Sequence, residues 1–276
     1  MSKWSIDSRF GERIKIALSI PFSFKNWAAV YRNILSDVPI SRLELRTGEI
    51  IRGREDTQLW IHYNDIWNKA AYTQRFAVPK GATVIDIGAN VGIFALLAAK
   101  SARLVHAFEP EPRNYDLIQQ NCHGKSNIVI HNEAVGATDG TASLSIGSSS
   151  TAFSLYGDAA QTRPVSVRTL SSVFSDYDIE YCDFLKLDCE GAEYPILLDS
   201  PPEIFSKIGL LAMEYHDHLS THTHQDIVDR LRMLGFQSAV YHVSGTFGMI
   251  AAWRDSATTL PGSSERQRPS TAAQPA

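Results

Sequence analysis

Several features that define common protein classes are scarce in this sequence of 276 residues. The three cysteines, Cys122, Cys182 and Cys189, form no Cys-x-x-Cys pair, so we expect neither a disulfide framework nor a zinc site of the usual spacing. Basic residues (26) do not outnumber acidic ones (30), whereas binding to a nucleic-acid backbone normally needs clustered Lys and Arg. The sequence therefore favours a reduced protein that does not bind nucleic acid, with the cysteines as small core residues.

Long apolar runs are also missing. The run at 16–22 is short, follows Arg13 and Lys15, contains Pro21, and lacks a small-residue cleavage site after it. We therefore expect neither a signal peptide nor a membrane span. The overall composition, 44% apolar and 20% charged, is typical of one α/β domain with a modest extension, and we expect a cytoplasmic location.

What the sequence does contain is a nucleotide-site pattern at residues 84–100. The apolar segment Val-Ile-Asp-Ile breaks at Gly88, and an apolar helix pattern begins after Gly92. Glycine permits a sharp turn and a close approach of the backbone to a ligand, which the N-terminus of the helix then faces. Asp86 is an acid inside this buried strand, so it needs a hydrogen-bond donor, and we expect a ligand or a loop amide.

Residues 1–80 precede this pattern and differ from it. Aromatic and apolar residues recur at helical spacing over the first 40 residues, which predicts helices that cover the core. Residues 43–52 alternate apolar and polar around Thr47-Gly48, which predicts a β-hairpin outside the main sheet. The aromatics of 60–76 either pack over a cofactor or complete the core, and we expect core packing. We interpret the whole segment as a cap that helps to form the acceptor pocket.

From residue 81 to 255, predicted strands and helices alternate, which indicates a mostly parallel sheet with right-handed crossovers. Two strands joined at Ser244-Gly245 predict an antiparallel pair that closes this sheet. The Ser- and Gly-rich, hairpin-like stretch at 138–154 is either a lid or a solvated loop. The composition of 256–276 predicts a disordered tail.

Polar residues follow the first three predicted strands of the sheet, at the edge where such sheets bind ligands. Glu109 lies about 20 positions after Gly88, the separation at which a carboxylate reaches ribose hydroxyls, and Pro110 shapes the turn after it. Glu133 and Ala134 follow the third strand, where a side chain or a backbone amide can bind an adenine edge.

The fourth and fifth predicted strands end in ionisable residues. Asp188, Glu190 and Glu193 follow one buried strand, and Glu214 and His216 end the next. A charge run in a loop is usually solvated, but at the ligand edge of a sheet we interpret these side chains as functional.

A second group of histidines follows the fifth strand. His218, His222 and His224 lie close to His216 in the sequence and suggest a metal site. However, Thr223 with Asp226 resembles a capping box, so we expect His222 and His224 on the exposed first turn of a helix.

Five motifs occur in order across residues 43–253: Val-Ile-Asp-Ile-Gly-Ala-Asn-Val-Gly, Phe-Glu-Pro, Asn-Glu-Ala-Val-Gly, Leu-Lys-Leu-Asp-Cys-Glu-Gly-Ala-Glu and Met-Glu-Tyr-His. Together they resemble the FkbM-type S-adenosylmethionine-dependent methyltransferases, and the Asp-x-Glu-Gly-Ala-Glu block is far more specific than a glycine turn. The resemblance implies a Rossmann-like class I methyltransferase fold with a seven-stranded, mostly parallel sheet. It also implies S-adenosylmethionine as cofactor, surrounded by Asp86, Gly88, Asn90, Gly92, Glu109, Pro110, Glu133 and Ala134.

Members of this family typically methylate hydroxyl groups of sugars, macrolides and other secondary metabolites, and some are linked to amide N-methylation. We therefore expect O-methylation of a small-molecule or glycan acceptor, with N-methylation as an alternative. Two other classes stay open: a nicotinamide-dependent oxidoreductase, although Gly-Ala-Asn-Val-Gly is not Gly-x-Gly-x-x-Gly, and a non-catalytic cofactor-binding protein. A homodimer is compatible with the sequence, which does not fix the oligomeric state.

The chemistry of a sulfonium donor suggests roles for the last two strand ends. The methyl group is already activated, so the enzyme mainly aligns the acceptor, and a base adds about 10² to 10⁴ in rate. We expect His216 as this base, with Asp188 and Glu214 orienting it or holding the acceptor hydroxyl. Glu190 and Glu193 are expected to contact the acceptor. We expect no metal ion, although Asp188, Glu190 and Glu214 form a conceivable carboxylate set for one.

Overall fold

A seven-stranded sheet forms the centre of the protein in the computed structural model, which describes residues 16–56, 58–146, 153–154 and 162–254. In spatial order the strands are β12 (Gln237–Ser244), β13 (Phe247–Trp253), β11 (Ile208–His216), β10 (Cys182–Leu187), β3 (Thr83–Ile87), β4 (Leu104–Phe108) and β5 (Ile128–His131). The strands from β11 to β5 pair in parallel, and β13 is antiparallel to both β11 and β12. The predicted seven-stranded, mostly parallel sheet with its antiparallel pair is confirmed.

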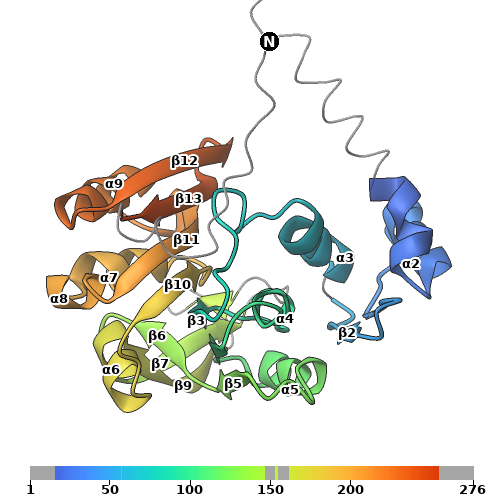
Figure 1. The fold of residues 1–276 in the computed structure, drawn as a ribbon, viewed down its shortest axis with the longest axis horizontal. Helices are drawn as coiled ribbons and strands as arrows, with labels where there is room; N and C mark the ends of the chain where they lie inside the picture. The colour runs from blue at the N-terminus through green and yellow to red at the C-terminus, as the bar shows by residue number, and fades with distance from the viewer. Residues whose placement is uncertain (1–15, 57, 147–152, 155–161, 255–276) are drawn as a thin grey trace, which may run out of the picture.

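Helices cover both faces of this sheet (Figure 1). One face carries α4 (Ile93–Ala98) and α5 (Pro112–Asn121), and the other carries α6 (Leu170–Asp176), α7 (Glu193–Asp199), α8 (Pro202–Phe205) and α9 (His224–Met233). Successive strand side chains point to opposite faces, so Val84 joins one core cluster and Ile85 the other. Burial on both faces explains why the central strands have nearly continuous apolar sequences.

The N-terminal segment packs beside the first of these faces (Figure 1). It contains helical residues 16–23, α2 (Trp27–Ser36), β1 (Arg42–Glu44), β2 (Ile50–Arg52), α3 (Leu59–Tyr63) and the π-helical turn η1 (Asn64–Asn68). The expected hairpin is present, because β1 and β2 pair antiparallel in a sheet of their own. Trp60 and Tyr63 are buried in the core, as we expected for the aromatics of this segment.

A smaller sheet follows the third core strand and consists of β6 (Ala134–Gly136), β9 (Thr162–Thr169), β7 (Gly140–Ile146) and β8 (Phe153–Ser154). Its antiparallel β7–β8 pair fits the hairpin-like stretch expected at 138–154, whereas β6 and β9 were not foreseen. The core of this sheet is formed by Ala134, Leu144, Val165 and Val167. The loop centre of the hairpin-like stretch, for which a lid was considered, and the segment 256–276 lie outside the described residues. No helix in the described part of the chain is long and apolar enough to cross a membrane.

Candidate active site

A cavity of about 540 Å³ opens at the carboxyl ends of β3, β4, β10 and β11, at the edge that the sequence indicated. Its volume lies within the range of about 300–1,000 Å³ that is usual for small-molecule sites. The expected site residues that line it are Gly88, Asn90, Glu109, Pro110, Glu133, Ala134, Asp188, Glu190, Glu214 and His216. Asp86, Gly92 and Glu193 were also expected there but do not line the cavity.

The glycine turn at the end of β3 is packed tightly against the end of β10. Gly88 has a φ of +73°, and a Cβ added to it would lie 1.8 Å from the carbonyl oxygen of Asp188. Glycine is therefore required there to bring two strand ends together. Gly92, at φ +85°, lies against Ile118 and Cys122 instead, so it allows α4 to pack on α5 and does not face the cavity.

Glu109 is held at the end of β4 by amide groups. Its Oε2 accepts the backbone N–H of Asn90 at 2.8 Å, and its Oε1 accepts that of Glu111 at 2.9 Å. The side-chain amide of Asn114, a residue that the sequence did not single out, lies 3.5 Å from Oε1. Burial raises the pKa of Glu109 to about 7, although these hydrogen bonds oppose the shift. A carboxylate oriented in this way at a cavity wall fits the ribose of a nucleoside.

Asp86 has a different partner from the one expected. The prediction of a ligand or a loop amide is wrong, because Lys186 on the neighbouring strand places its Nζ 3.1 Å from Asp86 Oδ1. The same ammonium group donates to the carbonyl oxygen of Gly88 at 2.7 Å. Burial alone would lower the pKa of Lys186, but Asp86 and Asp188 outweigh it and raise that pKa, so the lysine stays charged. Asp86 thus helps to position Lys186, which in turn holds the glycine turn by its hydrogen bond to Gly88.

Glu133 lines the cavity, but the protein itself occupies its carboxylate. Arg168 donates to Oε1 at 3.1 Å, and the hydroxyl of Tyr177 donates to Oε2. The neighbouring backbone at Ala134 also borders the cavity. A hydrogen bond from this strand end to an adenine edge would therefore come more easily from the backbone than from the Glu133 side chain.

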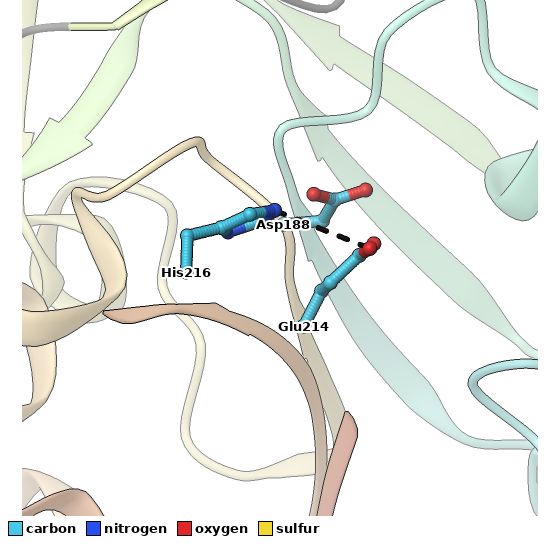
Figure 2. A group of neighbouring side chains, drawn as sticks. All are labelled: Asp188, Glu214 and His216. Carbon is cyan, nitrogen blue, oxygen red and sulfur yellow. Dashed lines mark ion pairs between the residues drawn. The ribbon is translucent and has the colours of Figure 1, made fainter. Parts of the chain in front are cut away.

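The ends of β10 and β11 bring Asp188, Glu214 and His216 together (Figure 2). The Nε2 atom of His216 lies 4.0 Å from Glu214 Oε1. Tyr72, one of the aromatics of 60–76 for which we expected core packing, donates its hydroxyl to Asp188 Oδ2 at 2.6 Å and lies 3.1 Å from Glu214 Oε2. These contacts confirm that the two strand ends form one cluster.

The two other acids of the Asp-Cys-Glu-Gly-Ala-Glu loop occupy different places. Glu190 lines the cavity and lies 3.7 Å from His216 Nε2. Glu193 is fully buried beneath the loop, where it accepts the backbone N–H groups of Cys189 and Gly191, both at 2.7 Å. One of its oxygens also lies 3.4 Å from His216 Nδ1. Glu193 therefore holds the loop and the imidazole, in contrast to the acceptor contact that we expected.

The cluster is strongly coupled electrostatically. Burial and the charge of Asp188 raise the pKa values of Glu190 and Glu214 to about 8. Burial alone would lower the pKa of His216, but the surrounding carboxylates, Glu193 above all, raise it to about 9. His216 is therefore in its charged, doubly protonated form near neutral pH. In this form it cannot act alone as the base that we expected.

The neighbouring histidines follow the expected helix only in part. The capping box of Thr223 and Asp226 is present at the start of α9, and His222 is exposed. His224 is half-buried, because its Nδ1 lies 2.7 Å from an oxygen of Asp217 and its ring stacks on Tyr215. The expectation that His224 is exposed is wrong.

Comparison with known proteins assigns this fold and site to a class. The Methyltransferase FkbM domain family matches residues 86–238, more than half of the chain. AMB antimetabolite synthetase AmbE of Pseudomonas aeruginosa is 22% identical in an alignment 245 positions long that covers 72% of this chain and 12% of AmbE. The chain thus spans a small fraction of the length of this curated relative.

Solved structures with a similar arrangement include two other methyltransferases. Methyltransferase FkbM of Methylobacillus flagellatus KT is 15% identical, with a TM-score of 0.45, over 69% of this chain and 48% of that one. Precorrin-6y C5,15-methyltransferase of Geobacter metallireducens GS-15 is 13% identical, with a TM-score of 0.41, over 64% of this chain and 81% of that one. The glycine turn and the acids at the strand ends lie within the residues that the methyltransferase domain matches. By its domain match, the chain belongs to the FkbM methyltransferase family and is an S-adenosylmethionine-dependent methyltransferase.

Proposed function

We propose that this enzyme methylates a hydroxyl group of a small-molecule or glycan acceptor. The observation that carries the proposal is the cluster of Asp188, Glu214 and His216 in one cavity with the amide-held carboxylate of Glu109. S-adenosylmethionine supplies an electrophilic methyl group, and Glu109, the Gly88–Asn90 turn and the backbone at Ala134 are the residues that would hold it. The acceptor would then lie at the β10 and β11 ends of the cavity.

Hydroxyl groups suit this second end chemically. Carboxyl oxygens accept hydrogen bonds, so Asp188 and Glu214 bind and orient the hydroxyl groups of an acceptor. Apolar side chains such as Ile66, Phe247 and Met249 line the same cavity and offer a surface to a sugar or polyketide ring. The hydroxyl proton passes to a carboxylate of this cluster as the methyl group is transferred.

An amine or amide acceptor is the second candidate. The excess of carboxylates at the β10 and β11 ends also stabilises an ammonium group, and the same in-line transfer would then methylate nitrogen. A cytoplasmic location and a homodimer remain part of the proposal. The unpaired state of Cys122, Cys182 and Cys189 supports the reducing compartment.

Incubation of the full chain with methyl-labelled S-adenosylmethionine tests the proposal. Native extracts and a panel of hydroxylated sugars, polyketides and amines serve as acceptors, and product fragmentation separates O- from N-methylation. We expect an O-methylated product whose formation falls about 10² to 10⁴-fold in Asp188→Asn, while cofactor affinity changes little. Label on nitrogen supports the second candidate, and cofactor binding without transfer to any acceptor contradicts both.

A further inference from the structure

The β10 and β11 ends of the cavity hold more carboxyl groups than basic side chains among the residues that the structure describes. Asp188, Glu190 and Glu214 line the cavity there, and two further carboxylates are buried next to it, Asp86 beside Lys186 and Glu193 beside His216. Lys186 forms ion pairs with Asp86 and Asp188, and its closest contact is with Asp86. Buried charges need partners, so this arrangement favours an added cation.

Three side chains of this group have the geometry of a metal site. One ligand atom each from Asp188, Glu214 and His216 can be chosen so that all three lie within 4.8 Å of one another. Metal–oxygen distances of about 2.0–2.1 Å place opposite ligands roughly 4 Å apart, so small side-chain movements would close the site. Figure 2 shows the edge of the His216 ring turned toward the space beside the two carboxyl groups.

His216 provides an observation that does not depend on the acidic residues. Its side chain is more than nine-tenths buried and borders the cavity, yet in the described part of the chain no hydrogen bond reaches its Nε2. Its other nitrogen, Nδ1, lies 3.4 Å from Glu193, which is itself anchored by two backbone amides. A carboxylate behind the second ring nitrogen is the usual support of a metal-bound histidine, because it fixes the ring and its tautomer.

Tyr72 and Lys186 supply the same kind of support for the carboxylates. The hydroxyl of Tyr72 donates a hydrogen bond to Oδ2 of Asp188 and lies 3.1 Å from Oε2 of Glu214. The Nζ atom of Lys186 lies 3.9 Å from the same oxygen of Asp188. The second oxygen of each carboxylate has no hydrogen bond to any described residue, and that of Glu214, Oε1, lies 4.0 Å from His216 Nε2. One oxygen of each acid is thus held in place while the other stays open to a ligand.

We propose that Asp188, Glu214 and His216 bind a divalent cation of the Mg²⁺ or Mn²⁺ type. Two carboxylate oxygens and one imidazole nitrogen would leave coordination positions for water and for oxygen atoms of the acceptor. The set differs from the one considered from the sequence, since His216 replaces Glu190. The role toward the acceptor rests on the proposed function, whereas binding of the ion can be measured without cofactor or acceptor.

Titration of the chelator-treated full chain with Mn²⁺ tests this site, because the electron paramagnetic resonance signal of free Mn²⁺ reports binding directly. We expect one saturable Mn²⁺ per chain and a higher melting temperature in its presence. Asp188→Asn and Glu214→Gln should each weaken binding more than tenfold. Glu193→Gln, which leaves the ligands in place, should weaken it about 10- to 100-fold.

His222→Ala is the matched control, since it removes an exposed histidine near the cluster and should leave Mn²⁺ affinity unchanged. Calorimetric binding of S-adenosylmethionine, without metal, shows that each variant is folded. The metal site is refuted if wild-type chain that binds the cofactor takes up no Mn²⁺, or if Asp188→Asn and Glu214→Gln bind it as tightly. Mn²⁺ uptake without methyl transfer would instead refute the proposed acceptor and leave the metal site standing.

Discussion

The two ends of the cavity both present carboxylates at the ends of buried strands, but the protein treats them differently. At the β4 end, Glu109 accepts N–H groups from Asn90 and Glu111, so the fold itself satisfies its oxygens. At the β10 and β11 ends, Asp188 and Glu214 share one tyrosine hydroxyl, Asp188 lies 3.9 Å from Lys186, and Glu214 lies 4.0 Å from His216. The hydrogen bonds of Glu109 are therefore complete before any ligand binds, whereas Asp188 and Glu214 still need a cation or protons.

This difference matches the proposed functions of the two ends, cofactor binding at the β4 end and acceptor binding at the β10 and β11 ends. A pre-satisfied carboxylate stays in one place and binds the same ligand groups each time, as a cofactor site requires. In a cluster whose carboxyl groups lack hydrogen-bond donors, the bound ligand determines the charge and the side-chain geometry. Such a cluster suits a site where a proton or a cation must be exchanged.

Lys186 connects the two ends, and its replacement should have the largest effect. It pairs with the fully buried Asp86, binds the Gly88 carbonyl oxygen, and approaches Asp188. Lys186→Met leaves the fully buried Asp86 without its ion-pair partner, which should lower the free energy of unfolding by about 3–5 kcal/mol in equilibrium urea denaturation. The double variant Asp86→Leu with Lys186→Met should recover most of this loss, because it removes both charges. A loss of under about 1 kcal/mol in the single variant would show that the pair behaves like a solvated one.

A comparison of two glutamates tests whether the β4 end is the cofactor end. Glu109 and Glu133 both border the cavity, but Arg168 and Tyr177 already occupy Glu133. Glu109→Gln removes a charged acceptor and places an NH₂ group against a backbone N–H, so affinity for S-adenosylmethionine should fall about 10- to 100-fold in calorimetry. Glu133→Gln should change it by less than about threefold, since its side chain is held by the protein. Equal losses in both variants would contradict the assignment of the ribose to Glu109.

The local signals in the sequence predicted the central sheet well. Val84 and Ile85 belong to a run that is apolar because both faces of β3 are buried, and Glu109 lies at a fixed distance along the chain from Gly88. The strand β9 was missed because Val165 and Val167 alternate with polar residues on a sheet with one buried face, a weaker signal interrupted by Pro164.

The contacts that complete the site could not be predicted, since they join distant segments. Tyr72 reaches Asp188 across 116 positions, from a segment without regular structure. The pairing of Asp86 with Lys186 depends on the register between β3 and β10, which places these two residues side by side. The sequence did show an aspartate and a lysine inside two apolar strands, but each residue alone suggests a contact with a ligand and gives no sign of the ion pair between them. Sequence therefore locates strand-end residues, while register and long-range packing decide which of them meet.

The pH dependence of cofactor affinity is the smallest effect and the finest test of the comparison. Burial raises the pKa of Glu109 to about 7, and ribose hydroxyls donate to the ionised form, so a bound nucleoside favours loss of that proton. Affinity for S-adenosylmethionine should therefore rise about tenfold between pH 6 and 8 and then level off.

Glu109→Gln supplies the reference for this measurement, because titration of the cofactor itself and of the Asp188 cluster affects both proteins alike. The ratio of wild-type to variant affinity, measured by calorimetry at each pH, should climb through pH 7 and stay constant above pH 8. A flat ratio would mean that Glu109 is ionised throughout or does not touch the ligand. In that case the pH dependence of affinity would arise at the β10 and β11 ends, where Glu190 and Glu214 have pKa values of about 8.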